Sequence, residues 1–351
     1  LLTGLHARSS EPPPGETGAD HWVAAGFLCA EKPRKTAGAD VYAGQTIDQI
    51  IVTAQKREER LQDVPIAISV LSGEKLDSAP APDLGAALKE VPGVVTLVGN
   101  NFGGSTISVR GVAAASSNYN GSSPVGFYVD TVPFAFIRQA FTPNPNIYDL
   151  HRVEVLRGPQ GPLYGGGGLG GGRRVLTHSA DVDEFEFKSR VAINQVDGGG
   201  EGYRGDAAAN FPIIPGKFAA RIVAGYQNDS GWVDRPIHPR HDEDYNDSKV
   251  TNLRLKLAIQ PSEDLSIQIG NWLSDSRYGG LPLSLPNQTR NSIMDEPVRS
   301  KFNEHDITIN YDFAPFSLRS MTSYIDFENT SILDVAAAFG TNLGFPGNRF
   351  D

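Results

Sequence analysis

Apolar and polar residues alternate along the second half of the chain, from about residue 181 onwards. In segment 251–259 one face carries Leu253, Leu255, Leu257 and Ile259, and the residues between them are mostly polar. The same alternation recurs in four further runs: 185–193, 218–226, 265–269 and 306–313. A period of two predicts β-strands, and runs of roughly 9–13 residues are near the length that crosses a bilayer at a tilt.

One further run, 316–327, loses the alternation near Ser320, so the sequence leaves its register open. Together these patterns predict about seven antiparallel strands over residues 181–351. A soluble β-sandwich would also place apolar residues on one face, so alternation alone does not separate the two architectures.

The connections between the predicted strands favour a membrane barrel over a sandwich. The links at 212–216, 261–264 and 314–315 are tight, whereas 228–247 and 274–300 are long and polar. Alternating short and long links are typical of outer-membrane barrels, which have short periplasmic turns and long extracellular loops. Four aromatic residues near strand ends are interpreted as parts of interfacial girdles: Tyr226, Trp272, Tyr311 and Phe313.

The first half of the chain has a mixed pattern, which predicts a small α+β domain over residues 47–180. Its strand candidates are 50–53, 65–71, 94–98, 106–112, 125–132 and 152–156. Asp83 is placed as an N-cap, followed by a helix with Leu84, Ala87, Leu88 and Val91 on one face. Pro92-Gly93 would end that helix.

Residues 1–46 are expected to form a disordered or non-native leader. The chain begins with Leu1 rather than Met, so we expect the natural start to lie upstream. The apolar stretch 23–30 precedes its basic residues, which is the wrong order for a secretory signal, and the flanks do not fix a signal-peptide position.

Composition excludes several classes of protein. The 351 residues carry 31 basic and 41 acidic side chains, a net charge of -10, which argues against a nucleic-acid partner. A single cysteine, Cys29, excludes an internal disulfide. No apolar run reaches the length of a transmembrane helix, so membrane insertion would require a barrel. No nucleophile stands at a recognisable spacing from a base, so we do not expect an enzyme.

Several motifs of the first half resemble, in order, those of the TonB-dependent outer-membrane receptors. Segment 48–54, Asp-Gln-Ile-Ile-Val-Thr-Ala, is similar to the TonB box, and 56–65 resembles the entry to the plug domain. Segments 91–94, 107–111 and 125–130 match further plug motifs. The most specific match is Arg-Val-Glu-Val-Leu-Arg-Gly-Pro-Gln-Gly at 152–161, continued by Leu-Tyr-Gly at 163–165. The resemblance covers about residues 48–330.

The chain departs from the family pattern at several positions. Thr131 stands where glycine is common, and Pro162 replaces a usual threonine or serine. The run 165–172, seven glycines and Leu169, replaces a more varied stretch, and Arg173-Arg174 stands where the next strand is usually apolar. The glycine run lacks the Lys-Ser/Thr ending of a phosphate loop, so a plug hinge fits it better than nucleotide binding.

The resemblance implies an α+β plug domain followed by antiparallel transmembrane β-barrel strands. Roughly 22 strands close such a barrel, so the seven expected here form an incomplete one. Two explanations remain open: a fragment of a longer gene product, or a truncated product that does not transport. A truncated product could act as a soluble plug-like binding or signalling module. A secreted β-sandwich binding protein is a third hypothesis.

The function implied is TonB-dependent active import of a scarce ligand across the outer membrane of a Gram-negative bacterium. A ferric siderophore or another iron complex is the expected ligand, although the sequence does not name it. The partners implied are the energy-transducing protein TonB, the ligand and outer-membrane lipid, without a cofactor. The residues expected to couple to TonB are Ile50, Ile51, Val52, Thr53 and Ala54. Their alternative role is an ordinary first strand of the plug.

Three weaker groups of candidate residues remain. Arg110, Glu154 and Arg157 are expected either to rearrange in a charged network between plug and barrel wall or to form static ion pairs. Tyr119 and Tyr128 are candidates for a plug apex that touches the ligand. His238 and His241 lie beside carboxylates and could ligate a metal, but a solvated loop explains them better.

Overall fold

The computed structural model describes most of the chain from residue 66 to residue 334 and five short stretches before it. The described residues are 20–25, 29–31, 51–52, 59–60, 63–64, 66–78, 84–97, 106–113, 123–134, 146–159, 168–236, 241–282, 284–285, 287–314, 316–332 and 334. Among them, no helix is long and apolar enough to cross a membrane.

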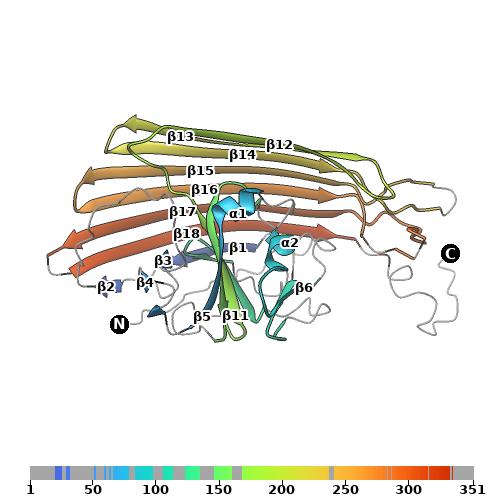
Figure 1. Ribbon diagram of the computed structural model, residues 1–351, viewed down its shortest axis with the longest axis horizontal. Helices are drawn as coiled ribbons and strands as arrows, with labels where there is room; N and C mark the ends of the chain where they lie inside the picture. The colour runs from blue at the N-terminus through green and yellow to red at the C-terminus, as the bar shows by residue number, and fades with distance from the viewer. Residues whose placement is uncertain are drawn as a thin grey trace, which may run out of the picture.

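The second half of the chain forms a large sheet of seven consecutive antiparallel strands (Figure 1). They are β12 (Glu186–Gln195), β13 (Glu201–Ile214), β14 (Phe218–Asp229), β15 (Ser248–Ser262), β16 (Leu265–Tyr278), β17 (Val298–Phe313) and β18 (Phe316–Ser331). Each strand pairs with the next along the chain, so the predicted antiparallel meander is confirmed.

Strand β13 is the one that the alternation did not reveal. Its outward positions include Gly205, Ala207 and Ala209, which are too small to produce a hydropathy contrast with the residues between them. The contrast lies in the charge of the other face, where Arg204 and Asp206 are buried.

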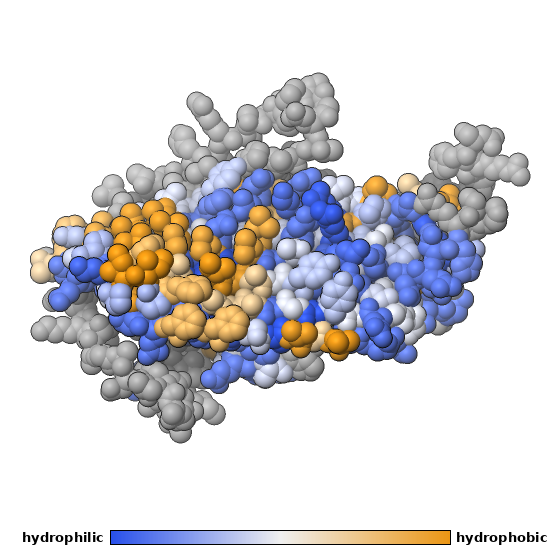
Figure 2. All heavy atoms as spheres, turned by 90° about the horizontal axis from the view of Figure 1, so that it is seen from above, coloured by the Kyte–Doolittle hydropathy of each residue, from blue (hydrophilic) through white to orange (hydrophobic). Residues whose placement is uncertain are grey.

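The two faces of the large sheet differ in polarity. On the outer face, Leu257, Ile269 and Ile307 lie opposite one another on β15, β16 and β17. Figure 2 shows apolar side chains gathered over one part of this face and polar side chains over the rest. The register places this apolar region towards the tight turns that join β13 to β14, β15 to β16 and β17 to β18. An apolar band on one face of a meander is what a lipid-facing surface requires.

Trp272 is a correction to the predicted aromatic girdle. Its side chain lies on the inner face of β16 and is 2% exposed, so it packs inside the molecule rather than at an interface with lipid headgroups. Successive side chains of a strand point to opposite faces of the sheet. The neighbours of Trp272, Asn271 and Leu273, point outward, so Trp272 points inward. Tyr226 and Phe313 do lie exposed on the outer face.

A compact α+β domain lies against the inner face of the large sheet (Figure 1). Its five-stranded sheet has the order β5 (Ala67–Ser72), β10 (Leu150–Arg157), β11 (Gly171–Thr177), β8 (Val125–Val129) and β9 (Val132–Pro133). A hairpin of β6 (Val94–Leu97) and β7 (Thr106–Val109) and two helices, α1 (Gly73–Ser78) and α2 (Leu84–Leu88), complete it. Helix α2 confirms the predicted helix, because Leu84, Ala87 and Leu88 are all buried.

Four short strands precede the compact domain. The backbones of β1 (Asp20–Ala25) and β2 (Cys29–Glu31) pair with β18, whereas the sequence predicts a disordered or non-native leader over 1–46. Backbone pairing to a sheet edge depends little on side-chain pattern, so such strands leave a weak sequence signal. Further along, β3 (Ile51–Val52) pairs with β4 (Glu59–Arg60) as a separate two-stranded sheet.

Candidate functional site

The interface between the compact domain and the large sheet is the candidate functional site. Polar residues of the domain meet buried charged residues of the sheet at two clusters, and an aromatic contact lies beside them. Each feature joins residues far apart in the chain, so the interface exists only in the folded molecule.

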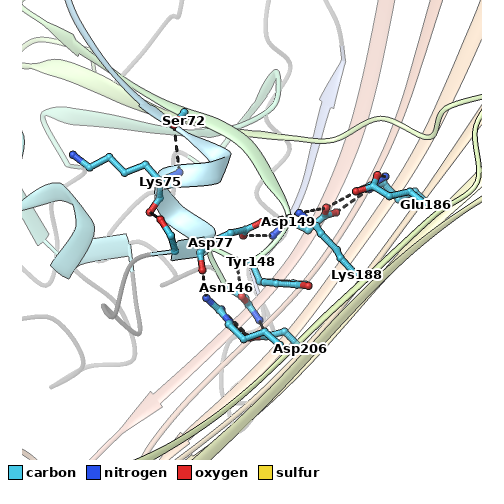
Figure 3. A network of polar contacts seen from close by, with 12 residues as sticks. Ser72, Lys75, Asp77, Asn146, Tyr148, Asp149, Glu186, Lys188 and Asp206 are labelled. Carbon is cyan, nitrogen blue, oxygen red and sulfur yellow. Dashed lines mark hydrogen bonds and ion pairs between the residues drawn. The ribbon is translucent and has the colours of Figure 1, made fainter. Parts of the chain in front are cut away.

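The first cluster centres on Asp149, which lies just before β10 and is 1% exposed. The Arg221 guanidinium of β14 donates to both carboxylate oxygens of Asp149, with Nε 2.9 Å from Oδ2. The Lys188 ammonium of β12 lies 3.0 Å from Oδ1 (Figure 3). Burial alone would raise the pKa of Asp149, but these two cations outweigh it and hold that pKa below its ordinary value. Asp149 is therefore ionised at neutral pH.

The surroundings of Asp149 add contacts from three elements. Lys188 also pairs with Asp77 of α1 at 2.6 Å, and it lies 5.2 Å above the Tyr148 ring. Arg254 of β15 donates to the backbone carbonyls of Tyr148 and Asp149, and its guanidinium stacks on Trp272. We define the Asp149 cluster as Asp77, Tyr148, Asp149, Lys188, Arg221 and Arg254.

A glycine allows the compact domain to approach the sheet beside this cluster. Asp206 of β13 accepts a hydrogen bond of 2.8 Å from the Asn146 amide. A side-chain carbon at Gly225 of β14 would lie 2.3 Å from that amide nitrogen. A residue larger than glycine at position 225 would displace the Asn146 amide.

The second cluster surrounds Asp130, which follows β8. Lys256 of β15 bridges Asp130 at 2.9 Å and Asp306 of β17 at 3.2 Å. Asp130 also accepts hydrogen bonds of 2.8 Å from the backbone and hydroxyl of Thr177. Burial raises the pKa of Asp130, but Lys256 and Thr177 outweigh it and leave the pKa below its ordinary value. With Glu304 of β17, these residues form the Asp130 cluster.

Gly270 of β16 provides a test of the Asp130 cluster. A Cβ at this position would lie 1.8 Å from the Asp306 carboxylate and 2.7 Å from the Lys256 ammonium. We expect Gly270→Ala to displace the ion pair and weaken the interface by about 1–3 kcal/mol, measured by amide exchange of the compact domain. Gly205→Ala is the matched control, because open space surrounds that position. Equal protection in both variants would contradict the assignment.

An aromatic contact joins the two parts beside the charged clusters. Phe134 of the compact domain meets Phe302 of β17 edge to face, with ring centroids 5.6 Å apart. Phe302 in turn contacts Trp272 at 5.7 Å. These rings belong to one buried core that includes residues of both parts, so the domain and the sheet share apolar packing.

The charged residues singled out from the sequence are not brought together. Glu154 is buried within the compact domain and pairs with Arg152 at 2.7 Å and Arg174 at 2.6 Å. Arg157 lies on the opposite face of the same strand and donates to Ser69. Arg110 is exposed in a turn with a φ of 52°. Their predicted rearrangement stays a prediction.

Most of the other sequence candidates are exposed or lie outside the described residues. Tyr128 is buried within the compact domain, beside Gly126 and Gly172. His241 is exposed. Among the described residues, no group of three or more His, Cys, Asp or Glu is arranged to hold a metal ion. Ile50, Thr53, Ala54, Tyr119 and His238 lie outside the described residues, and of Ile51 and Val52 only the backbone is described.

At the end of the sheet opposite the tight turns, hydrogen bonds connect described residues of the two long links, 228–247 and 274–300. Arg290 binds Glu296 through two hydrogen bonds of 2.6 and 2.8 Å, and both residues are buried. The backbone of Asp234, from the other link, pairs with Gln288 and Arg290 at 2.9 Å. These contacts give the polar end of the sheet an ordered surface.

Comparison with known proteins finds a family match in the first half of the chain and relatives that extend beyond it. Residues 60–172 match the TonB-dependent receptor plug domain. The iron-regulated outer membrane virulence protein of Vibrio cholerae is 29% identical over 235 residues, which are 65% of this chain and 34% of that protein. The pesticin receptor of Yersinia pestis is 29% identical over 212 residues, 60% of this chain and 30% of that receptor.

Solved structures show the same fold. The ferric yersiniabactin uptake receptor of Yersinia pestis aligns with a TM-score of 0.66 at 20% identity, over 76% of this chain and 41% of that chain. The ferripyoverdine receptor of Pseudomonas aeruginosa aligns at 0.63 and 16% identity, over 80% and 37%. This chain thus spans between about a fifth and about a third of the length of these curated relatives and of a vitamin B12 transporter of Vibrio vulnificus that it also matches.

Proposed function

Because the chain belongs to the TonB-dependent receptors of the bacterial outer membrane, we propose that it takes part in energised import of an iron complex. In this proposal residues 47–180 are the plug, which includes the compact domain, and residues 181–351 are part of the barrel wall. A ferric siderophore is the proposed ligand, since the aligned structures include ferric yersiniabactin and ferripyoverdine receptors. TonB is the proposed partner.

The observation that carries the proposal is the polar character of the interface between the two parts. Import requires the compact domain to leave its position, or to rearrange, and then to return. Charged side chains such as Asp149, Lys188 and Arg221 can exchange their partners for water when the interface opens. A purely apolar interface would expose a large hydrophobic area in the same step.

The structure describes the backbone of two residues of the segment proposed to couple to TonB. They form strand β3, whose register with β4 comprises the pairs Ile51–Arg60 and Val52–Glu59. An extended segment of this kind can add to the sheet of a partner, where backbone hydrogen bonds give affinity. A pull on this segment would reach the compact domain through the chain that follows.

Deletion of residues 50–54 from the whole receptor tests this coupling. We expect energised uptake of the iron complex to fall to background while equilibrium binding of the ligand to cells is unchanged. Val52→Pro, which removes a backbone donor, should reproduce the loss, and Val52→Thr, which retains strand propensity, should not. Unchanged uptake in the deletion would remove the coupling role from this segment.

A further inference from the structure

Glu304 is a buried carboxyl group in the Asp130 cluster. It lies on the inner face of β17, is 2% exposed, and its Oε1 atom has no hydrogen-bond partner among the described residues. Directly opposite it stand Trp272 of β16 and Ile325 of β18, neither of which can neutralise a charge. A buried carboxylate in such a position is strongly unfavourable, whereas a neutral carboxyl group is tolerated.

The charges around Glu304 do not compensate it. The surrounding groups are Lys256 of β15, Asp306 of the same strand and Asp130 of the compact domain. The next inner-face residues on β16 and β18, opposite Asp306, are Gly270 and Ser323, which carry no charge. The Ser323 hydroxyl is itself buried without a partner. Lys256 already binds Asp130 and Asp306, so three carboxyl groups share one ammonium group.

The next inner-face cation along β15 is Arg254, which also acts electrostatically on Asp130. Its guanidinium stacks on Trp272, and its hydrogen bonds go to the carbonyls of Tyr148 and Asp149 in the neighbouring cluster. A proton bound to Glu304 would remove its negative charge, and it requires no additional ligands.

We propose that Glu304 binds a proton when the compact domain lies against the sheet, so that the Asp130 cluster is a proton-linked contact. When Glu304 loses this proton, its negative charge faces Asp130 and Asp306 with no further cation to offset it. The contact between domain and sheet then weakens as the pH rises. This inference goes beyond the proposed function, because it depends on neither TonB nor a ligand.

The experiment uses the whole receptor folded in lipid vesicles, without TonB and without ligand. The reporters are the backbone amides of Asp130 and Phe134, which donate to Val175 and Phe127 in the segment beside the sheet. Over the pH range in which Glu304 is ionised when the contact is open but protonated when it is closed, their exchange protection, corrected for the intrinsic effect of pH, is expected to fall about tenfold per pH unit, as a single linked proton requires. Infrared spectra should show a protonated carboxyl band throughout this range, and the fall should level off at the pH where the band disappears.

Glu304→Gln keeps the shape of the neutral side chain and cannot ionise. We expect high protection without the fall as the pH rises, and loss of one protonated carboxyl band. Glu263→Gln, in the exposed turn between β15 and β16, is the matched control and should retain the wild-type profile. Asp306→Asn provides an independent variant: with one negative charge fewer beside Glu304, the fall should level off at lower pH.

A flat wild-type profile, a fall that persists in Glu304→Gln, or an unchanged carboxyl band would each overturn the proposal. Failure of TonB coupling would leave all three measurements unaffected, so the two proposals fail separately.

Discussion

Replacement of Asp149 by alanine is expected to weaken the contact between the compact domain and the large sheet by about 3–5 kcal/mol. Asp149 is fully buried, and its removal leaves the guanidinium of Arg221 and the ammonium of Lys188 without their shared partner. The cost arises less from the lost attraction than from two cations that each lose one carboxylate at a buried site and keep a single one, Glu186 for Arg221 and Asp77 for Lys188.

Amide exchange of the compact domain in the whole receptor measures this effect. A loss of 3–5 kcal/mol corresponds to about two to four orders of magnitude in protection. The double variant Asp149→Ala with Arg221→Ala should regain part of the lost protection, because it also removes a cation that Asp149 had paired with. Asp264→Ala, in an exposed turn, is the matched control. Protection within a few-fold of wild type would show that Asp149 does not hold the domain in place.

The pH dependence of the Asp149 contact has a defined sign. Its folded-state pKa lies below the ordinary value of 3.8, so the contact contributes its full stabilisation above that pH. The stabilisation is lost as the pH falls through the lowered pKa. The Asp149 cluster therefore fails in acid, whereas the contact proposed for Glu304 weakens in base.

Strand positions in the large sheet follow from the sequence because one face meets an apolar environment. Leu253 and Ile307 belong to runs in which a one-residue slip would reverse both faces, so their register is strongly determined. Strand β13 could not be predicted in the same way, because several of its outward residues are small. The phase slip near Ser320 did not interrupt β18, which runs from Phe316 to Ser331.

The residues of the interface were harder to predict, for a physical reason. Arg221, Arg254 and Lys256 stand at the polar positions of alternating runs, where solvent is the ordinary expectation. Only the docking of a second domain turns that face into a buried one. A signal was nonetheless present: these polar positions carry cations at three sites in β14 and β15. Asp149, by contrast, lies in no periodic pattern, and its partners are on strands distant in sequence.

The aromatic contact should respond differently from the charged clusters. Phe302→Ala is expected to destabilise the packing of the compact domain on the sheet by about 3–5 kcal/mol. Phe302 is 2% exposed and touches Phe134 on one side and Trp272 on the other, so its removal leaves a cavity between the two parts. The loss should be nearly independent of salt and of pH, since no charge is involved.

Comparison of Phe302→Ala with Asp149→Ala then shows how much of the stability of the interface comes from aromatic packing and how much from the charged contacts. Both are followed by amide exchange of the compact domain, at low and high salt and at several pH values. Phe313→Ala, which removes the same side chain from the outer face of the same strand, is the matched control and should leave the compact domain unaffected. If Phe302→Ala lowered the exchange protection no more than that control, the contact of the rings would contribute little to the stability of the interface. If its effect is large and salt-independent, the aromatic contact can keep the domain near the sheet while the charged clusters open, and the import proposed above would not require the compact domain to detach completely.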